Sequence, residues 1–224
     1  MLDLSLKKSD FMTYLLAQIN HVFPDKITPS GDPLFKIAFD IALDRTYYCF
    51  KHINMPAFNK NGITTFSHLH SDQYTMFLWF LSSSLWQEYE DEIYAKKFFY
   101  LNRVINSFLC MYDTKLPEIF LIHHGIGTTL GKASYSNFFV CCQGATVGAH
   151  HGQYPVIGKG VSLLPNSSVI GRSNIEDGVS IGANCMLYEK DVERQSVVFN
   201  ESGCNKVKKK EQPWAQKFFT VPVI

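Results

Sequence analysis

Aliphatic residues recur at every sixth position in the second half of the chain, and this spacing restricts the fold more than any other feature. A repeat of this length accommodates a short strand and a turn, and three repeats close one triangular coil. The aliphatic residue of each repeat then points to the axis and stacks on the coil below. The unbroken series is Ile157, Leu163, Val169, Ile175, Ile181 and Leu187.

A second, weaker series of the same period precedes the first one. Glycine follows the repeat position or its neighbour at Gly158, Gly171 and Gly182, where tight corners need backbone freedom. Residues 149–154 interrupt the period, so we expect a loop there that projects from one corner and contributes to function. The members of the weaker series are Ile122, Thr128, Ser134, Val140 and Thr146.

The first half of the chain has apolar residues at spacings of three and four, which is typical of amphipathic helices. Proline, asparagine and glycine in residues 54–65 indicate a loop. Ser9 is the expected cap of the first helix. In the second, the predicted buried stripe is Leu34, Ile37, Ala38, Ile41 and Ala42. The predicted helices span residues 9–22, 33–51, 71–90 and 95–109.

These patterns predict an α + β chain with an α-helical domain over residues 1–110, a parallel β-helix over 111–192 and a C-terminal tail over 193–224. The 21 basic and 20 acidic residues give a net charge of +1, which argues against a nucleic-acid partner. The longest apolar run, residues 76–81, is too short for a membrane span. Cys141 and Cys142 are adjacent on an expected strand and cannot face each other, so reduced thiols in a cytoplasmic protein are predicted.

Three segments carry a family likeness: residues 123–131 (HHGIGTTLG), 143–148 (QGATVG) and 154–158 (YPVIG). They resemble the serine acetyltransferase-like branch of the hexapeptide-repeat acyltransferases. The stretch 70–75 (HSDQYT) looks like members associated with bacterial capsule and O-antigen polysaccharides. The resemblance implies a left-handed β-helix, acetyl-CoA as acyl donor and a homotrimer with the acyl-CoA cleft between subunits.

The resemblance implies that His124 is the general base, because the family motif has Asp-His where this chain has His123-His124. An imidazole titrates near neutrality and can take the proton of an attacking hydroxyl. For the group that orients His124 we consider Asp113 first, then Glu118, then a backbone carbonyl.

Two departures from the family pattern bear on the acceptor. His123 replaces the Asp, and Gln153-Tyr154-Pro155 replaces the basic-residue-His-Pro that contacts the substrate amino acid. The charges that suit a zwitterion are therefore lost, and Gln and Tyr suit a neutral hydroxyl-bearing sugar better. His123, His151, Gln153 and Tyr154 are the predicted substrate-binding residues.

The resemblance also implies a track for coenzyme A along one edge of the coil. Backbone N–H groups near Gly148 and Ala149 would stabilise the oxyanion. By position, Asn166, Ser167, Ala183 and Asn184 continue that edge. The lysines of the tail, Lys208 among them, either bind the coenzyme phosphates or belong to a solvated tail.

The remaining histidines are less informative. No metal is predicted, because neighbouring side chains diverge in an extended chain and so the His123-His124 and His150-His151 pairs are poor chelators. His70 and Asp72 lie at a helix start, where Ser71 or Asp72 caps the helix or His70 and Asp72 contact the acceptor.

The sequence thus predicts an acetyl-CoA-dependent O-acetyltransferase that acts on a sugar hydroxyl of a bacterial surface polysaccharide or its precursor. The alternatives are a serine O-acetyltransferase, an amino-sugar N-acetyltransferase and a non-catalytic scaffold.

Overall fold

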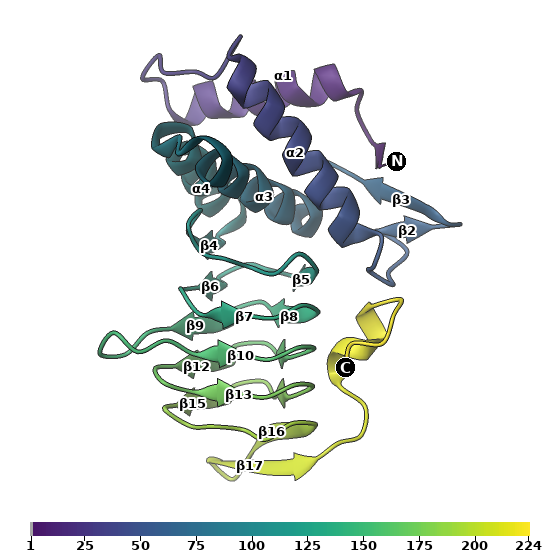
Figure 1. The fold of residues 1–224 in the computed structure, drawn as a ribbon, viewed down its shortest axis with the longest axis vertical. Helices are drawn as coiled ribbons and strands as arrows, with labels where there is room; N and C mark the ends of the chain where they lie inside the picture. The colour runs from purple at the N-terminus through teal and green to yellow at the C-terminus, as the bar shows by residue number, and fades with distance from the viewer. Residues whose placement is uncertain (1) are drawn as a thin grey trace.

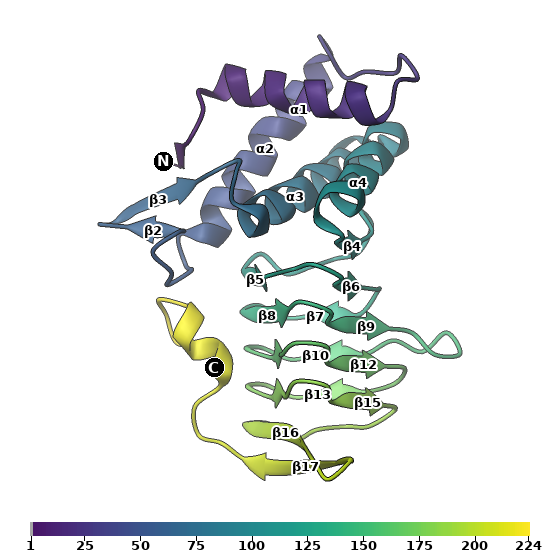
Figure 2. The same ribbon diagram turned by 180° about the vertical axis from the view of Figure 1, so that it is seen from behind.

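The computed structural model describes residues 2–224 and has a helical part stacked on the end of a β-helix (Figures 1 and 2). The helices are α1 (Lys8–Val22), α2 (Pro33–Phe50), α3 (Ser71–Tyr89) and α4 (Glu92–Asn106). The predicted helix over 95–109 therefore begins and ends three residues earlier. The predicted class, an α-helical N-terminal part followed by a left-handed parallel β-helix, is confirmed.

Two local predictions for the helical part differ from the structure. Ser9 does not cap α1; its hydroxyl bonds Asp10 instead. The stripe predicted on α2 is right for Ala38 and Ala42, which are buried, and wrong for Leu34 and Ile37, which are each 49% exposed while Phe35 and Phe39 are buried. These aromatic rings supply more buried area per residue than the aliphatic side chains, and so they determine which face of α2 turns inward.

Residues 54–65, predicted as a loop, contain a small sheet. Strand β1 (Asp3–Leu4) pairs in parallel with β3 (Ile63–Phe66), and β3 pairs antiparallel with β2 (Asn59–Lys60). The turn between β2 and β3 is Asn61-Gly62, both with positive φ, which is the turn type that favours a two-residue hairpin.

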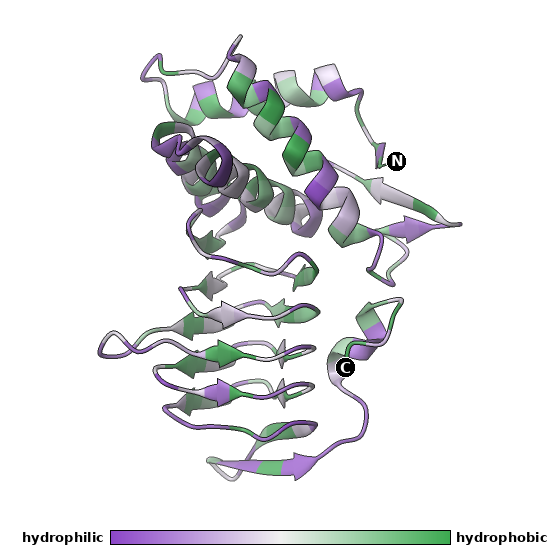
Figure 3. Ribbon diagram, viewed as in Figure 1, coloured by the Kyte–Doolittle hydropathy of each residue, from purple (hydrophilic) through white to green (hydrophobic). Residues whose placement is uncertain are grey.

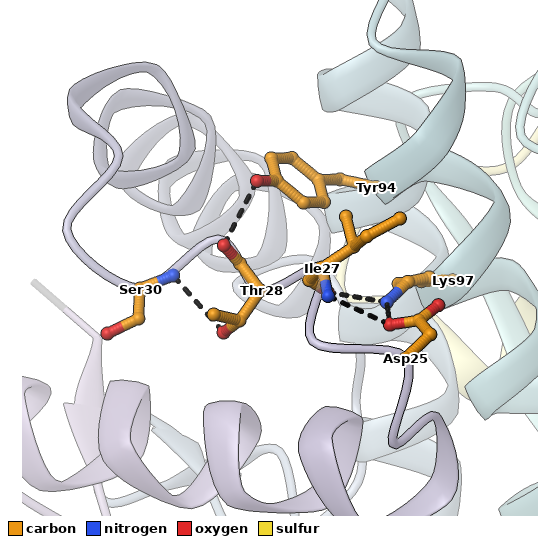
Figure 4. Close-up of polar contacts among 6 residues, drawn as sticks. All are labelled: Asp25, Ile27, Thr28, Ser30, Tyr94 and Lys97. Carbon is orange, nitrogen blue, oxygen red and sulfur yellow. Dashed lines mark hydrogen bonds and ion pairs between the residues drawn. The ribbon is translucent and has the colours of Figure 1, made fainter.

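The connection between α1 and α2 is tied to α4 by hydrogen bonds (Figure 4). The buried Lys97 on α4 binds Asp25 at 2.6 Å and the carbonyl of Ile27. The Lys97 ammonium beside Asp25 lowers the pKa of that carboxyl. Tyr94 donates to the carbonyl of Thr28 at 3.0 Å. These bonds hold the α1–α2 connection against α4, which packs beside α3.

Three parallel sheets form the faces of the β-helix. The first contains β5 (Phe120–His123), β8 (Phe139–Cys142), β11 (Ser162–Leu163), β14 (Ser180–Ile181), β16 (Ser196–Glu201) and, antiparallel at its edge, β17 (Cys204–Lys209). The second contains β4 (Leu109–Cys110), β6 (Thr129–Leu130), β9 (Thr146–Gly148), β12 (Ser168–Ile170) and β15 (Met186–Tyr188). The third contains β7 (Ser134–Tyr135), β10 (Val156–Ile157) and β13 (Asn174–Ile175).

The residues of the unbroken series stack inside the coil as predicted, and all are buried. The weaker series was in the wrong register after Ile122. The structure aligns Ile157 with Tyr135, Leu163 with Cys141 and Val169 with Val147, each one residue later than predicted. The shift arises because the corner after β5 is longer than one repeat allows, with left-handed residues at His124 and Gly127.

Both ends of the coil stack are covered. Phe120 on the first coil packs against Trp79 and Phe80 of α3, with ring centroids 5.4 Å apart in each pair. At the other end the mostly hydrophilic strand β17 closes the first sheet (Figure 3). Terminal coils of a solenoid need such covers, because each coil otherwise exposes its apolar interior.

The C-terminal segment runs back along the first sheet to the helical part (Figure 1). The Trp214 amide donates to the Ser180 hydroxyl, and the Asn54 amide donates to the carbonyl of Phe218 at 2.7 Å. Residues 193–224 thus comprise the ordered hairpin of β16 and β17 and a returning segment with a short helix, η1 (Trp214–Phe218).

All six cysteines are free thiols, and five of them are buried. Within residues 2–224 no helix combines the length and the apolar character that crossing a bilayer requires.

Candidate active site at the corner after β5

His124 is the first residue beyond β5 and has a left-handed backbone with φ of 56°. This conformation costs a non-glycine residue roughly 1–2 kcal/mol, so other interactions must hold it. The side chain is 66% exposed and points away from the coil interior. Gly125 follows, and a Cβ there would meet the Cγ2 atom of Ile122 at 2.3 Å, so only glycine fits this turn.

Asp72 holds the turn in place. Its Oδ2 accepts the N–H of His124 at 3.0 Å, and its Oδ1 accepts the N–H of Gly125 at 3.3 Å. Its carboxylate is 8% exposed, and Oδ2 lies 3.8 Å from Nδ1 of the His124 ring. Hydrogen bonds to a charged acceptor contribute about 1.5–3 kcal/mol each, which exceeds the cost of the left-handed residue.

Asp72 lies inside the first turn of α3 and is not its cap. His70 is the N-cap residue, and its Nδ1 accepts the N–H of Gln73 at 3.5 Å. The expectation that Ser71 or Asp72 caps the helix was therefore wrong. The carboxylate instead joins the helical part to the first coil.

His123 lies beside His124 with its ring half-buried. The two ring centroids are 4.0 Å apart, and the ring of Phe218 lies 5.3 Å from His123. Burial, with a further contribution from the neighbouring His124, lowers the pKa of His123. The Nδ1 atom of His123 is buried and has no hydrogen-bond partner among residues 2–224.

Asp113, the first candidate for orienting His124, lies elsewhere. Its carboxylate pairs with Lys132 at 2.7 Å, and no hydrogen bond or ion pair joins it to His124 within the described residues 2–224. Glu118, the second candidate, lines a separate pocket of about 220 Å³ beside Arg45. Asp72 is the carboxylate that contacts His124.

A pocket of about 330 Å³ opens in front of His124. Its wall comes from the start of α3, the end of α4 and the corner after β5, which are distant in sequence. Seven of the nine lining residues are polar or glycine, Ile105 and Ile126 are apolar, and none is a lysine or arginine. The nine residues are Ser71, Asp72, Thr75, Ile105, Asn106, Ser107, His124, Gly125 and Ile126.

The same edge of the prism continues below His124 as a ladder of corners. Gly144 donates to the carbonyl of Ile126, Asn166 to that of Gln143, and Asn184 to that of Pro165. Asn166 and Asn184 adopt left-handed backbones, and both, with Ala183, are exposed. Ser167 is buried, and its hydroxyl donates to the Leu164 carbonyl, so it serves the corner itself.

The loop of residues 149–154 lies at a different corner. It connects β9 of the second sheet to β10 of the third, whereas His124 connects the first sheet to the second. The loop projects beyond β9, away from β5 and β8 (Figure 1). Within one chain, Gly148 and Ala149 therefore lie on another edge than Asn166 and Asn184, contrary to the sequence prediction, and His124 shares no edge with His151, Gln153 and Tyr154.

The loop is closed on itself and pinned at its base. His150 and Gln153 exchange backbone hydrogen bonds, and the His150 ring contacts Glu189 at 3.0 Å and the Tyr188 hydroxyl at 2.8 Å. His151, Gln153 and Tyr154 are exposed. Lys208 is likewise exposed, on β17, with its ammonium over the ring of Phe199.

Sequence reasoning did not identify Thr75, Asn106, Ser107 or Phe218 as neighbours of the site. Thr75 closes the stretch 70–75 but was given no role, and no motif marks Asn106 and Ser107 at the end of α4 or Phe218 near the C-terminus. The packing of α3 and α4 on the first coil brings Thr75, Asn106 and Ser107 to His124, and the returning C-terminal segment brings Phe218 to His123.

No family model and no curated protein matches this sequence. Solved serine acetyltransferases are similar in structure. The enzyme from Vibrio cholerae O1 biovar El Tor N16961 has 13% identity and a TM-score of 0.68, covering 88% of this chain and 78% of that one. Isoform 3 from Entamoeba histolytica, in complex with cysteine, has 18% identity and a TM-score of 0.58, covering 93% and 76%. A serine acetyltransferase in complex with CoA has 14% identity and a TM-score of 0.55, covering 80% and 72%. At these identities the likeness establishes the shared fold.

The role of Asp72 predicts a difference between two carboxylates. Asp72→Ala leaves two backbone N–H groups without their acceptor and should lower the free energy of unfolding by about 1–3 kcal/mol. Asp113→Ala removes a more exposed ion pair and should cost less than about 1 kcal/mol. Urea denaturation measures both values, and amide chemical shifts of His124 and Gly125 should move only in Asp72→Ala. Equal losses in the two variants would argue against the proposed role.

Proposed function

We propose that the protein is an acetyl-CoA-dependent O-acetyltransferase with His124 as general base. The observation that carries this proposal is the position of His124, which is exposed on a left-handed corner, held by the buried Asp72, and faces a pocket with several hydroxyl and amide side chains. An exposed imidazole on a fixed backbone is suited to proton transfer, because the backbone hydrogen bonds set the position of the residue and leave the ring nitrogens accessible.

The reaction that fits this geometry is direct transfer. Nε2 of His124 takes the proton of the acceptor hydroxyl while the oxygen attacks the thioester carbonyl. The tetrahedral intermediate collapses to the ester, and the imidazolium returns the proton to the departing coenzyme A thiolate. Nδ1 faces the Asp72 carboxylate at 3.8 Å, so Asp72 stabilises the imidazolium that forms between the two steps.

The pocket favours a neutral acceptor. A zwitterionic amino acid presents a carboxylate, and the lining residues include no lysine or arginine to bind it. The hydroxyl and amide groups of Ser71, Thr75, Asn106 and Ser107 suit the hydroxyls of a sugar. We therefore propose a saccharide acceptor from a bacterial surface polysaccharide, such as capsule or O-antigen, or its precursor.

Serine is the second candidate, favoured by the structural likeness to serine acetyltransferases. The third candidate, an amino-sugar N-acetyltransferase, would also use His124 as its base. The fourth, a non-catalytic scaffold, needs no base. Free thiols throughout the chain suit the cytoplasmic location that we propose.

The His124 corner and the loop of residues 149–154 lie on different edges of one chain. This separation supports a homotrimer in which the complete site lies between subunits. One chain supplies His124, Asp72 and the ladder with Asn166, Ala183 and Asn184. A neighbouring chain would supply Gly148 and Ala149 as oxyanion donors, with the loop of His151, Gln153 and Tyr154 facing the acceptor. His70, His123 and Lys208 remain proposed contacts, the first two for the acceptor and the last for coenzyme phosphates.

The role of His124 predicts the effect of removing its ring. His124→Ala should lower turnover by roughly 100- to 10,000-fold, because the attacking hydroxyl loses its proton acceptor, while coenzyme affinity stays within a few-fold. His21→Ala, an exposed histidine on α1, serves as the matched control and should behave like the wild type. Thiol release gives the rate and calorimetry gives the affinity. An unimpaired His124→Ala would mean that the base lies elsewhere.

The acceptor class predicts which compounds release coenzyme A. Acetyl-CoA mixed with capsule oligosaccharides should give free thiol, whereas serine and amino sugars should give little, because the pocket has no cationic partner for a carboxylate and no second acid for an ammonium group. Release with serine alone would establish the second candidate. Silence with every acceptor, together with no coenzyme binding by calorimetry, would favour the scaffold.

The shared site predicts complementation between two inactive variants. Trimers of His124→Ala alone, or of a chain with both Gln153→Ala and Tyr154→Ala, should be impaired. Co-refolded at equal amounts, about a quarter of the sites would pair an intact corner with an intact loop and recover activity. Activity of the mixture no higher than that of the separate variants would mean that corner and loop do not act together across subunits.

A further inference from the structure

Asp72, His123 and His124 form a compact group of metal-ligating side chains. One ligand atom from each lies within 4.8 Å of the other two. Adjacent histidines in an extended strand point to opposite faces, and for that reason no metal was predicted here. The left-handed backbone at His124 turns its ring back, so that the two ring centroids are only 4.0 Å apart.

The surroundings of these atoms also suit a cation. The buried Nδ1 atom of His123 has no hydrogen-bond partner within residues 2–224, and such an unsatisfied group costs free energy unless something binds it. The Asp72 carboxylate is 8% exposed and supplies the negative charge. Each of its oxygens accepts one backbone N–H and so retains a free lone pair.

We propose that Asp72, His123 and His124 bind one divalent transition-metal ion of the zinc type. Two imidazoles and one carboxylate form a three-ligand set that leaves a fourth position open, whereas Mg²⁺ and Ca²⁺ prefer oxygen ligands. Ligands of a tetrahedral zinc ion lie about 3.4 Å apart. His124 Nδ1 and Asp72 Oδ2 are already 3.8 Å apart, so small side-chain rotations complete the site.

Binding would also block the chemistry proposed above, and this step rests on the proposed function. A neutral imidazole that ligates a metal through Nδ1 carries its proton on Nε2. Nε2 of His124 then has no lone pair to accept a proton from the acceptor hydroxyl. The ion therefore inhibits acetyl transfer, because the imidazole that binds it can no longer act as the general base.

The test measures binding apart from activity. Chelator-treated full-length protein is titrated with Zn²⁺ by calorimetry and with Co²⁺ by visible absorption, which reports a low-coordinate geometry. His123→Asn removes one ligand, and His124→Gln serves as a second variant if the first does not fold. The matched control carries His150→Asn and Cys204→Ser, which remove a surface histidine beside a carboxylate and the exposed thiol.

One equivalent of Zn²⁺ should bind to the wild type and the control with equal affinity, and at least about 10- to 100-fold more weakly to His123→Asn. Equal binding to His123→Asn, or none to the wild type, would overturn the site. In the transferase assay, Zn²⁺ should inhibit the wild type reversibly on addition of chelator. Binding without inhibition would refute the inhibitory step alone. If the protein were inactive with every acceptor, the proposed function would fail, but calorimetry would still measure whether Zn²⁺ binds.

Discussion

The carboxylate of Asp72, with its two hydrogen bonds to the backbone of His124 and Gly125, is the interaction on which the arrangement of the site depends. It joins the first turn of α3 to the first corner of the β-helix. Because both acceptor bonds go to backbone groups, they fix where the corner lies while leaving the imidazole free. The helical part is therefore a structural component of the site as well as a cover for the coil.

The β-helix is built from repeated coils, and the candidate site lies at corners where the six-residue repeat is interrupted. Each inner column continues through the coils, as in Ile122, Cys141, Leu163 and Ile181, which align strand by strand. A corner that merely closes the coil needs only a small residue or an asparagine, as at Asn166 and Asn184. The corner at His124 is longer and exposes an imidazole ring, and the loop at 149–154 adds residues to another corner. Both irregularities are supported by regular coils beneath them.

Much of the fold could be predicted because its signals are local. The period of six fixed the inner positions from Ile157 to Leu187, and the spacing of apolar residues located four helices within a few residues. The register before residue 149 could not be predicted, since Gly125 and Gly127 indicate a turn but not the extra length of the His124 corner. His124 itself was found through its motif. The role of Asp72 and the pocket in front of His124 depend on tertiary packing between α3, α4 and the first coil.

The left-handed turn at His124 is the geometric feature that the proposed catalysis and the proposed metal binding have in common. It projects the ring into the pocket, and it also brings that ring beside His123 and above the Asp72 carboxylate. In the acyltransferase motif that this segment resembles, an Asp stands where this chain has His123, so a nitrogen ligand of the proposed metal site takes the place of a negative charge. The exchange removes a charged contact that suits an ammonium-bearing acceptor, and it gives the corner a second imidazole. The same substitution thus favours a neutral acceptor and a nitrogen-rich metal site.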